Sequence, residues 1–450
     1  MFTLEGRRHR LCDGIDRREF LRVGGLGVAG LTLADLLRHQ ALGGTRTAPR
    51  RPKSVIYIVL SGGPSHIDTW DPKPEAPVEF RGEFASIPTQ LPGVRFCELF
   101  PRQAAMLDKL ALVRGVRSVE NDHYLSEVYT GLPRSAGKRP AFGSVVSRLA
   151  ATTHRSPMPP FVSLRERGGE QFEFENPHYA GAGHSAFRPY GDALQSLAPM
   201  KDLSRLEDRR ALLAGFSNMQ RKLDQQDSVA GLDRFQQQAL EMITAPEVRQ
   251  AFDIKAEPPA TFERYQRGKY THQADYKIMY DWDPKPFVLA RRLVEAGVRV
   301  VTLQVGSWDH HSMPSQHIFK SYRHVLPVLD QNICALVSDL EERGLSDDVL
   351  VVVLGEFGRT PKIGSPYPGR EHWADAGCVL LAGGGLRMGQ VVGETDGRAE
   401  RSTTGTVTFQ NLMSTIYHVL DINPTTTLPD FNGRPQYLLE NPQPIRELTG

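Results

Sequence analysis

The sequence predicts an α/β protein with a mostly parallel central sheet. A continuous apolar run at residues 55–60, "VIYIVL", is bounded by turn residues and is typical of a strand buried on both faces. A strand at 298–305, an amphipathic helix at 325–342 and a strand at 349–354 then follow in order. Strands joined through a helix in this way run parallel with a right-handed crossover. We therefore expect these three strands in one sheet.

Two helices are predicted in the second half of the chain. Residues 286–296, "PFVLARRLVEA", begin near a proline and end at Gly297, as helices often do. The helix at 325–342 places one apolar stripe toward the sheet. This stripe consists of Ile333, Leu336, Val337 and Leu340. In the first half, residues 107–113 suggest a short second strand, and residues 121–131 suggest a helix.

One part of the chain has a different composition. Residues 194–254 are rich in Gln, Leu and charged side chains at helical spacing, which predicts a mostly helical insertion over 194–285. The predicted organisation has five parts: a signal region at 1–44, a linker at 45–54, an α/β domain at 55–440 that contains the insertion, and a tail at 441–450.

The N-terminal region carries an export pattern. Arg17 and Arg18 precede a mild, Gly-rich apolar run at residues 23–33, which is typical of a twin-arginine signal. The run is too short to span a bilayer, which takes ~20 residues. The alternative interpretation is a short amphipathic helix with incidental arginines. The signal predicts a periplasmic or cell-envelope protein, and we expect no transmembrane segment beyond it.

The charge and cysteine content exclude several classes of protein. The formal net charge is +2, and the excess lies in the signal region, which leaves basic and acidic residues balanced in the remainder. A neutral body gives no reason to expect nucleic acid as a partner. Three cysteines, Cys97, Cys334 and Cys378, lie outside the signal without C-x-x-C spacing, so we expect buried thiols and no zinc ribbon.

Histidine and carboxylate side chains follow the ends of the predicted strands. The C-terminal ends of parallel strands meet at one edge of a sheet, where α/β proteins bind ligands. Imidazole and carboxylate groups suit a divalent cation such as zinc, manganese or calcium. The sequence therefore predicts a metal site with four ligands: Asp309, His311, Glu356 and His372. The alternatives are ordinary loop caps for the two acids and a packed surface pair for His372 and Trp373.

Further polar residues lie beyond the same edge. His66 and Asp68 follow the strand at 55–60, and His123 lies in "NDHYLSEVYTG". Each of these three is a candidate second ligand or general acid/base. Arg359 could bind an anion through its planar guanidinium, or it could pair with Glu356.

The segments that contain these residues resemble the bacterial domain-of-unknown-function family 1501, which belongs to the alkaline phosphatase and sulfatase superfamily. The matching segments are "SGGPSHIDTWDPKP" (61–74), "NDHYLSEVYTG" (121–131), "ARRLVEAGVRVVTLQVGSWDHH" (290–311), "VLGEFGRTPKI" (353–363), "GREHW" (369–373) and "LLAGGGLRMGQVVGETD" (380–396). The resemblance implies a three-layer α/β/α sandwich, alkaline phosphatase-like, with a metal site at the strand tips. It also implies hydrolysis of phosphate or sulfate esters.

The sequence departs from the superfamily pattern at the catalytic positions. No Cys or Ser precedes Pro-x-Arg beside residues 121–131, so the formylglycine nucleophile of sulfatases is missing. Ser61-Gly62 and Glu356-Phe357 replace pairs of usual ligands. We expect an exported, metal-dependent hydrolase of small-molecule or glycan esters. The alternative is a catalytically inactive member that binds a ligand, a glycan or a protein.

The twin-arginine interpretation is directly testable. Changing both Arg17 and Arg18 to Lys should leave the protein in the cytoplasm, because the signal depends on the arginine pair. Cell fractionation followed by immunoblotting measures this. Periplasmic accumulation of the double variant at the wild-type level would refute this route.

Overall fold

The computed structural model describes residues 52–150, 156–165, 174–190, 245–271, 279–306, 308–314 and 317–450. The predicted signal region, most of the predicted linker and residues 194–244 of the predicted insertion lie outside the described residues.

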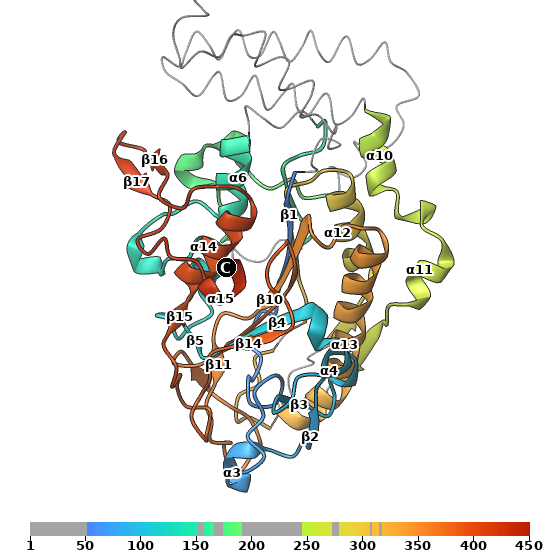
Figure 1. The fold of residues 1–450 in the computed structure, drawn as a ribbon, viewed down its shortest axis with the longest axis vertical. Coiled ribbons are helices and arrows are strands. Elements are labelled where there is room, and N and C mark those ends of the chain that lie inside the picture. Colours follow the sequence, from blue (N-terminus) through green and yellow to red (C-terminus); the bar gives the residue numbers. More distant parts are fainter. Residues whose placement is uncertain are drawn as a thin grey trace, which may run out of the picture. The chain divides into compact units, whose positions relative to one another are not determined.

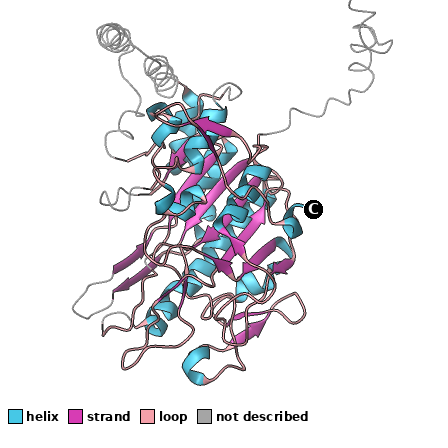
Figure 2. Ribbon diagram, turned by 90° about the vertical axis from the view of Figure 1, so that its left-hand side faces the viewer, coloured by secondary structure: helices cyan, strands magenta, loops and turns pink. Residues whose placement is uncertain are grey.

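A seven-stranded sheet forms the centre of the described part, in the order β14-β4-β13-β10-β1-β9-β6. Its strands are β1 (Ser54–Val59), β4 (Leu110–Arg114), β6 (Phe161–Ser163), β9 (Val300–Gln304), β10 (Val349–Leu354), β13 (Cys378–Gly383) and β14 (Gln390–Val392). Only β13 runs antiparallel to its neighbours. Strand β1 lies between β10 and β9 and is parallel to both, as the sequence predicts. The strands lie side by side between helices in Figure 2.

The two faces of the sheet are both buried, which explains the unbroken apolar runs in the sequence. Every residue of β1 and of β10 is buried. Alternate residues of β1 point to opposite faces: Ile56 and Ile58 join one core, whereas Val55, Tyr57 and Val59 join the other. A strand that is covered on both faces needs apolar side chains at every position.

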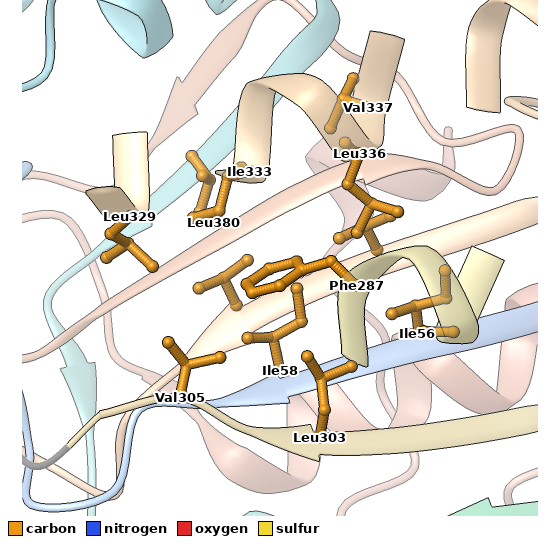
Figure 3. Close-up of a cluster of buried hydrophobic side chains, with 14 of the residues drawn as sticks. Ile56, Ile58, Phe287, Leu303, Val305, Leu329, Ile333, Leu336, Val337 and Leu380 are labelled. Atoms are coloured by element: carbon orange, nitrogen blue, oxygen red, sulfur yellow. The ribbon is translucent and has the colours of Figure 1, made fainter. Parts of the chain in front are cut away.

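Helices cover both faces of the sheet and give three layers. Helices α12 (Lys285–Glu295) and α13 (Ile318–Glu342) pack on one face. Helices α5 (Ser126–Thr130), α6 (Phe142–Ala150) and α14 (Phe409–Val419) pack on the other. Figure 1 shows these two sets on either side of β1 and β10. Figure 3 shows Phe287 of α12 and Ile333 of α13 over Ile58. The predicted α/β/α sandwich is therefore confirmed.

Some element boundaries differ from the predictions. Helix α13 begins at Ile318 rather than at residue 325 and continues through Pro327, with His317 as its N-terminal cap. The expected helix at 121–131 is limited to α5, which ends at Gly131 in a left-handed conformation (φ 77°). Residues 121–125 are irregular instead, and this places His123 in a loop.

The remaining elements are short. They are α3 (Val78–Arg81), β2 (Ser86–Pro88), β3 (Arg95–Cys97), α4 (Pro101–Ala105), β5 (Val116–Arg117), α10 (Pro246–Phe252), α11 (Pro259–Glu263), β7 (Gly268–Thr271), β8 (Met279–Trp282), β11 (Gly358–Arg359), β12 (His372–Trp373), β15 (Val407–Thr408), β16 (Thr427–Pro429), β17 (Pro435–Tyr437) and α15 (Arg446–Thr449). The described part of the predicted helical insertion thus also contains the antiparallel pair β7–β8. The last ten residues, which the sequence suggests are a tail, carry α15 and bury Ile445 and Leu448.

Two further observations concern the whole described part. None of its helices has the length and the apolar character that a bilayer crossing requires. Cys97, Cys334 and Cys378 are free and buried, in agreement with the prediction of buried thiols.

The packing of α13 predicts a large stability effect at its buried face. Leu336 is fully buried in the core, so Leu336→Ala should lower the free energy of unfolding by about 2–5 kcal/mol. Lys320→Ala, at an exposed position of the same helix, should change it by less than about 0.5 kcal/mol. Urea unfolding followed by circular dichroism measures both values. Equal effects would contradict the assignment of the two helix faces.

Candidate metal centre

Four potential ligands converge beyond the C-terminal edge of the sheet. His123 comes from the loop between β5 and α5, and Asp309 and His311 come from the loop after β9. His372 lies in β12, which pairs with β11 directly after β10. One ligand atom from each of these four residues lies within 4.8 Å of the others. Asp309, His311 and His372 thus meet because β9 and β10 flank β1 and end at the same edge of the sheet.

One carboxylate oxygen, Asp309 Oδ1, is the centre of this group. The Nε2 atom of His311 lies 2.7 Å from it, that of His123 lies 3.2 Å from it and that of His372 lies 3.5 Å from it. All three imidazoles therefore present the same ring nitrogen to the same oxygen. The Asp309 side chain keeps 31% of its surface exposed, so the group opens toward solvent.

The other nitrogen of each imidazole has its own partner. Nδ1 of His123 lies 2.7 Å from a carboxylate oxygen of Glu356, and Nδ1 of His372 lies 3.0 Å from the carbonyl oxygen of Asn121. Nδ1 of His311 contacts the carboxylate of Glu371. Since a carboxylate or a carbonyl only accepts, each Nδ1 carries a proton. A metal that displaces the proton of Nε2 would find the lone pair of that nitrogen directed toward the centre, an arrangement common to metal-binding histidines.

Glu356 is one of the partners that hold the Nδ1 atoms of the three histidines. Its side chain is buried, and the oxygen that binds His123 also accepts a hydrogen bond of 2.8 Å from the Gly62 N–H. Gly62 has a φ of 106°, and a Cβ atom there would lie 2.5 Å from the backbone nitrogen of Asp309. Only glycine permits this close approach. Glu356 therefore orients His123 in this structure, and the expectation that it is itself a metal ligand stays a prediction.

The aromatic rings of the group pack against each other. The ring centroids of His123 and His372 are 4.5 Å apart with an edge-to-face angle of 77°. On the inner side, the Phe357 ring lies against His372 with centroids 4.4 Å apart. These contacts fix the imidazole planes, because each ring limits the rotation of its neighbour.

The close charges shift the protonation of the group. Burial alone would raise the pKa of Asp309, but the three histidines and the Arg359 guanidinium hold that pKa far below its usual range. Burial lowers the pKa of His123, but the carboxylates of Asp309 and Glu356 outweigh it and raise the pKa to about 9. Asp309 and Glu371 likewise raise the pKa of His311 against the effect of burial. Asp309 is therefore an anion at neutral pH.

The donor set fits a divalent metal ion. The Nε2 atoms of His123 and His372 are shielded from solvent and, although aimed at Asp309, lie outside hydrogen-bonding geometry. Buried polar atoms without partners are costly unless a ligand satisfies them. Three imidazoles and one carboxylate suit zinc, whereas calcium prefers six to eight oxygens. Of the three metals expected from the sequence, calcium therefore fits least well.

Two predicted catalytic residues lie elsewhere. Asp68 is buried in an ion pair with Arg370, whose Nε and Nη2 atoms lie 2.7 and 3.1 Å from its two oxygens. His66 is also buried, with its Nε2 atom 2.9 Å from the carbonyl oxygen of Ala399, and burial lowers its pKa. Both side chains connect loops here, and their expected role as second ligands or acid/base groups stays a prediction.

Arg359 is also held by contacts within the chain. Its side chain is fully buried and donates hydrogen bonds to the carbonyl oxygens of Gly63 (2.8 Å) and Arg370 (2.9 Å). Its acidic partner is Asp309, at 2.6 Å, and not Glu356. The guanidinium is thus held by backbone carbonyls and by Asp309, and its expected role in anion binding stays a prediction.

Comparison with known proteins gives the family. The model of the family "Protein of unknown function (DUF1501)" matches residues 52–449, so the chain belongs to that family and the resemblance in the sequence is confirmed. No curated protein matches the chain.

Several solved structures are similar to this chain at low sequence identity. The lipoteichoic acid synthase LtaP from Listeria monocytogenes is 10% identical, with 86% of this chain and 78% of that chain covered and a TM-score of 0.34. The zinc complex of the periplasmic domain of EptC from Escherichia coli is 9% identical, with 89% and 93% covered and a TM-score of 0.38. The phosphonate monoester hydrolase SpPMH from Silicibacter pomeroyi is 10% identical, with 88% and 76% covered and a TM-score of 0.39.

The contact between the Glu356 carboxylate and His123 predicts a measurable effect on metal affinity. Glu356→Gln keeps the shape of the side chain but removes the charge behind His123, so zinc affinity should fall about 10–100-fold. Isothermal titration calorimetry measures the affinity. Glu341→Gln, in a surface pair with Lys109, is the control and should bind zinc like the wild type. Wild-type affinity in Glu356→Gln would show that this carboxylate does not support the centre.

Proposed function

We propose that the protein is an exported, metal-dependent hydrolase of phosphate or sulfate esters. The observation that carries the proposal is the convergence of three imidazole Nε2 atoms on one oxygen of Asp309. A divalent ion bound there would act as a Lewis acid toward an ester oxygen and would acidify water. Zinc is the proposed ion, and manganese is the second choice.

Some residues of such a site would bind the ion, and others orient the residues that bind it. Asp309, His123, His311 and His372 would hold the ion, and Glu356, Glu371 and the Asn121 carbonyl orient the rings. The Phe357 ring keeps water from the inner side of His372, so substrate would approach from the exposed side of Asp309. Water is the proposed nucleophile, which agrees with the missing formylglycine motif.

The proposed substrate class and location follow from features of the sequence. The ester chemistry is supported by the resemblance to the alkaline phosphatase and sulfatase superfamily, and by the position of the site at the strand tips. The periplasmic or cell-envelope location is supported by Arg17 and Arg18 before the apolar run. Small-molecule or glycan esters are the proposed substrates.

One observation favours a second function, a metal-containing binding protein without catalysis. Arg359, which the sequence suggests as the anion-binding group, is buried and hydrogen-bonded to backbone carbonyls. A hydrolase must neutralise the negative charge of an anionic ester. Here that charge would be neutralised by the metal alone, or by side chains that move toward the substrate when it binds.

Enzyme assays distinguish the two functions. Purified protein loaded with zinc or manganese should hydrolyse aryl phosphates or aryl sulfates, and His372→Ala should lower kcat/KM by at least about 100-fold, since it removes a ligand. The control is His324→Ala, at an exposed position of α13, which should retain wild-type activity. Protein that holds metal but hydrolyses neither ester class would support the binding function instead.

The pKa shifts predict how metal affinity depends on pH. Without metal, His123 has a pKa raised to about 9, so its imidazole is mostly protonated at neutral pH. A metal ion must displace this proton, because only the neutral imidazole binds. Zinc affinity should therefore fall as pH drops from about 9, by about tenfold per pH unit for each displaced proton. Calorimetric titrations at pH 6 and pH 8 check this. An affinity that does not change between these pH values would contradict the arrangement.

A further inference from the structure

We infer that the centre takes one divalent ion, and that the Arg359 guanidinium is a built-in second cation on the inner side of Asp309. The inference rests on the metal centre of the proposed function. It is carried by the contacts of the guanidinium, by the charges around the site and by the position of Phe357.

The guanidinium occupies a cage made of oxygen atoms. Nη2 donates to Asp309 Oδ1 at 2.6 Å and also to the carbonyl oxygen of Gly62. Nε donates to the carbonyl oxygen of Gly63 at 2.8 Å, and Nη1 donates to that of Arg370 at 2.9 Å. Carbonyl and carboxylate oxygens are the ligands that hard cations prefer. The surroundings of this guanidinium are therefore those of a cation site.

The neighbouring buried arginine is different in one respect. Arg370 is also fully buried, but it has the Asp68 carboxylate as a bidentate partner of its own. Within the described part of the chain, the acidic contact of Arg359 is Asp309, which it shares with three histidines. Its charge is therefore part of the metal centre, whereas that of Arg370 is neutralised within its own pair.

The charges around the site match a single divalent ion. Three carboxylates surround the histidines, those of Asp309, Glu356 and Glu371, and Arg359 contributes one positive charge. With neutral imidazoles, the group carries two negative charges, which one divalent ion neutralises. A second divalent ion would leave two uncompensated positive charges in a partly buried site, and such charges are costly.

An aromatic ring and a cation occupy the inner side of the centre. The Phe357 ring lies 4.4 Å from the His372 ring and 5.4 Å from the His123 ring, measured between centroids. The Arg359 guanidinium in turn lies 5.5 Å from the centroid of the Phe357 ring. Phe357 and the Arg359 guanidinium therefore lie at the positions where the ligands of a second ion would be needed.

The first test counts metal ions per chain. The wild-type protein is saturated with manganese or zinc, desalted and measured by native mass spectrometry and elemental analysis. One ion per chain, lost in His311→Ala, is the expected result. Two ions per chain would overturn this inference and leave the proposed hydrolase standing. No ion at all would overturn the metal centre, and this inference with it.

The second test replaces the guanidinium. Arg359→Ala vacates the oxygen cage and adds one net negative charge, so the variant should take up a second manganese ion. Millimolar guanidinium chloride, far below denaturing concentrations, should compete for the cage and return the count to one, whereas sodium chloride should not. Arg359→Lys, which keeps the charge, is the matched control and should stay at one ion. A folded Arg359→Ala that stays at one ion would overturn the inference. If Arg359→Ala does not fold, the metal counts of the wild type and of Arg359→Lys still test the inference. A second ion in either of these two proteins would overturn it.

Discussion

The arrangement of the candidate site depends on one oxygen atom, Asp309 Oδ1. It lies within 3.5 Å of three imidazole nitrogens and accepts a hydrogen bond from a buried guanidinium. Two of these histidines reach it from other loops, so each of those loops must end at the right place in the sheet. The strands supply that precision, because β1, β9 and β10 are adjacent and parallel. Loops without regular structure can hold side chains in defined positions when a rigid sheet fixes the residues at which the loops begin.

Much of this arrangement could be predicted from the sequence. Unbroken apolar runs identified β1 and β10, and the strand–helix–strand order placed Asp309 and Glu356 on one edge. His123 was expected near the site as well, but its loop conformation was not, since "NDHYLSEVYTG" has apolar residues at helical spacing. Tertiary contacts determine the conformation of this loop, because His123 contacts Glu356, which is 233 residues away in the sequence.

Three of the predicted site residues have contacts that the sequence does not indicate. Arg359, Asp68 and His66 are the residue types of an active site, and they lie directly after strands. Sequence patterns show where such residues occur, but they do not show burial or partners. In the structure all three are buried and hydrogen-bonded to distant loops, for example His66 to Ala399 and Asp68 to Arg370. The difference between a polar group that binds a ligand and one that holds loops together is set by long-range contacts.

The contact between Gly62 and Glu356 has a consequence for the order of assembly. These residues are 294 positions apart in the chain, yet their hydrogen bond fixes the carboxylate that orients His123. The parallel pairing of β1 with β10 closes a loop of similar length, so this hydrogen bond depends on the same long-range contact as the centre of the sheet. The four ligands are therefore dispersed in the unfolded chain and meet only when the sheet is complete. An ion at this centre would be acquired by a protein that has already folded, and it would not act as a nucleus for folding.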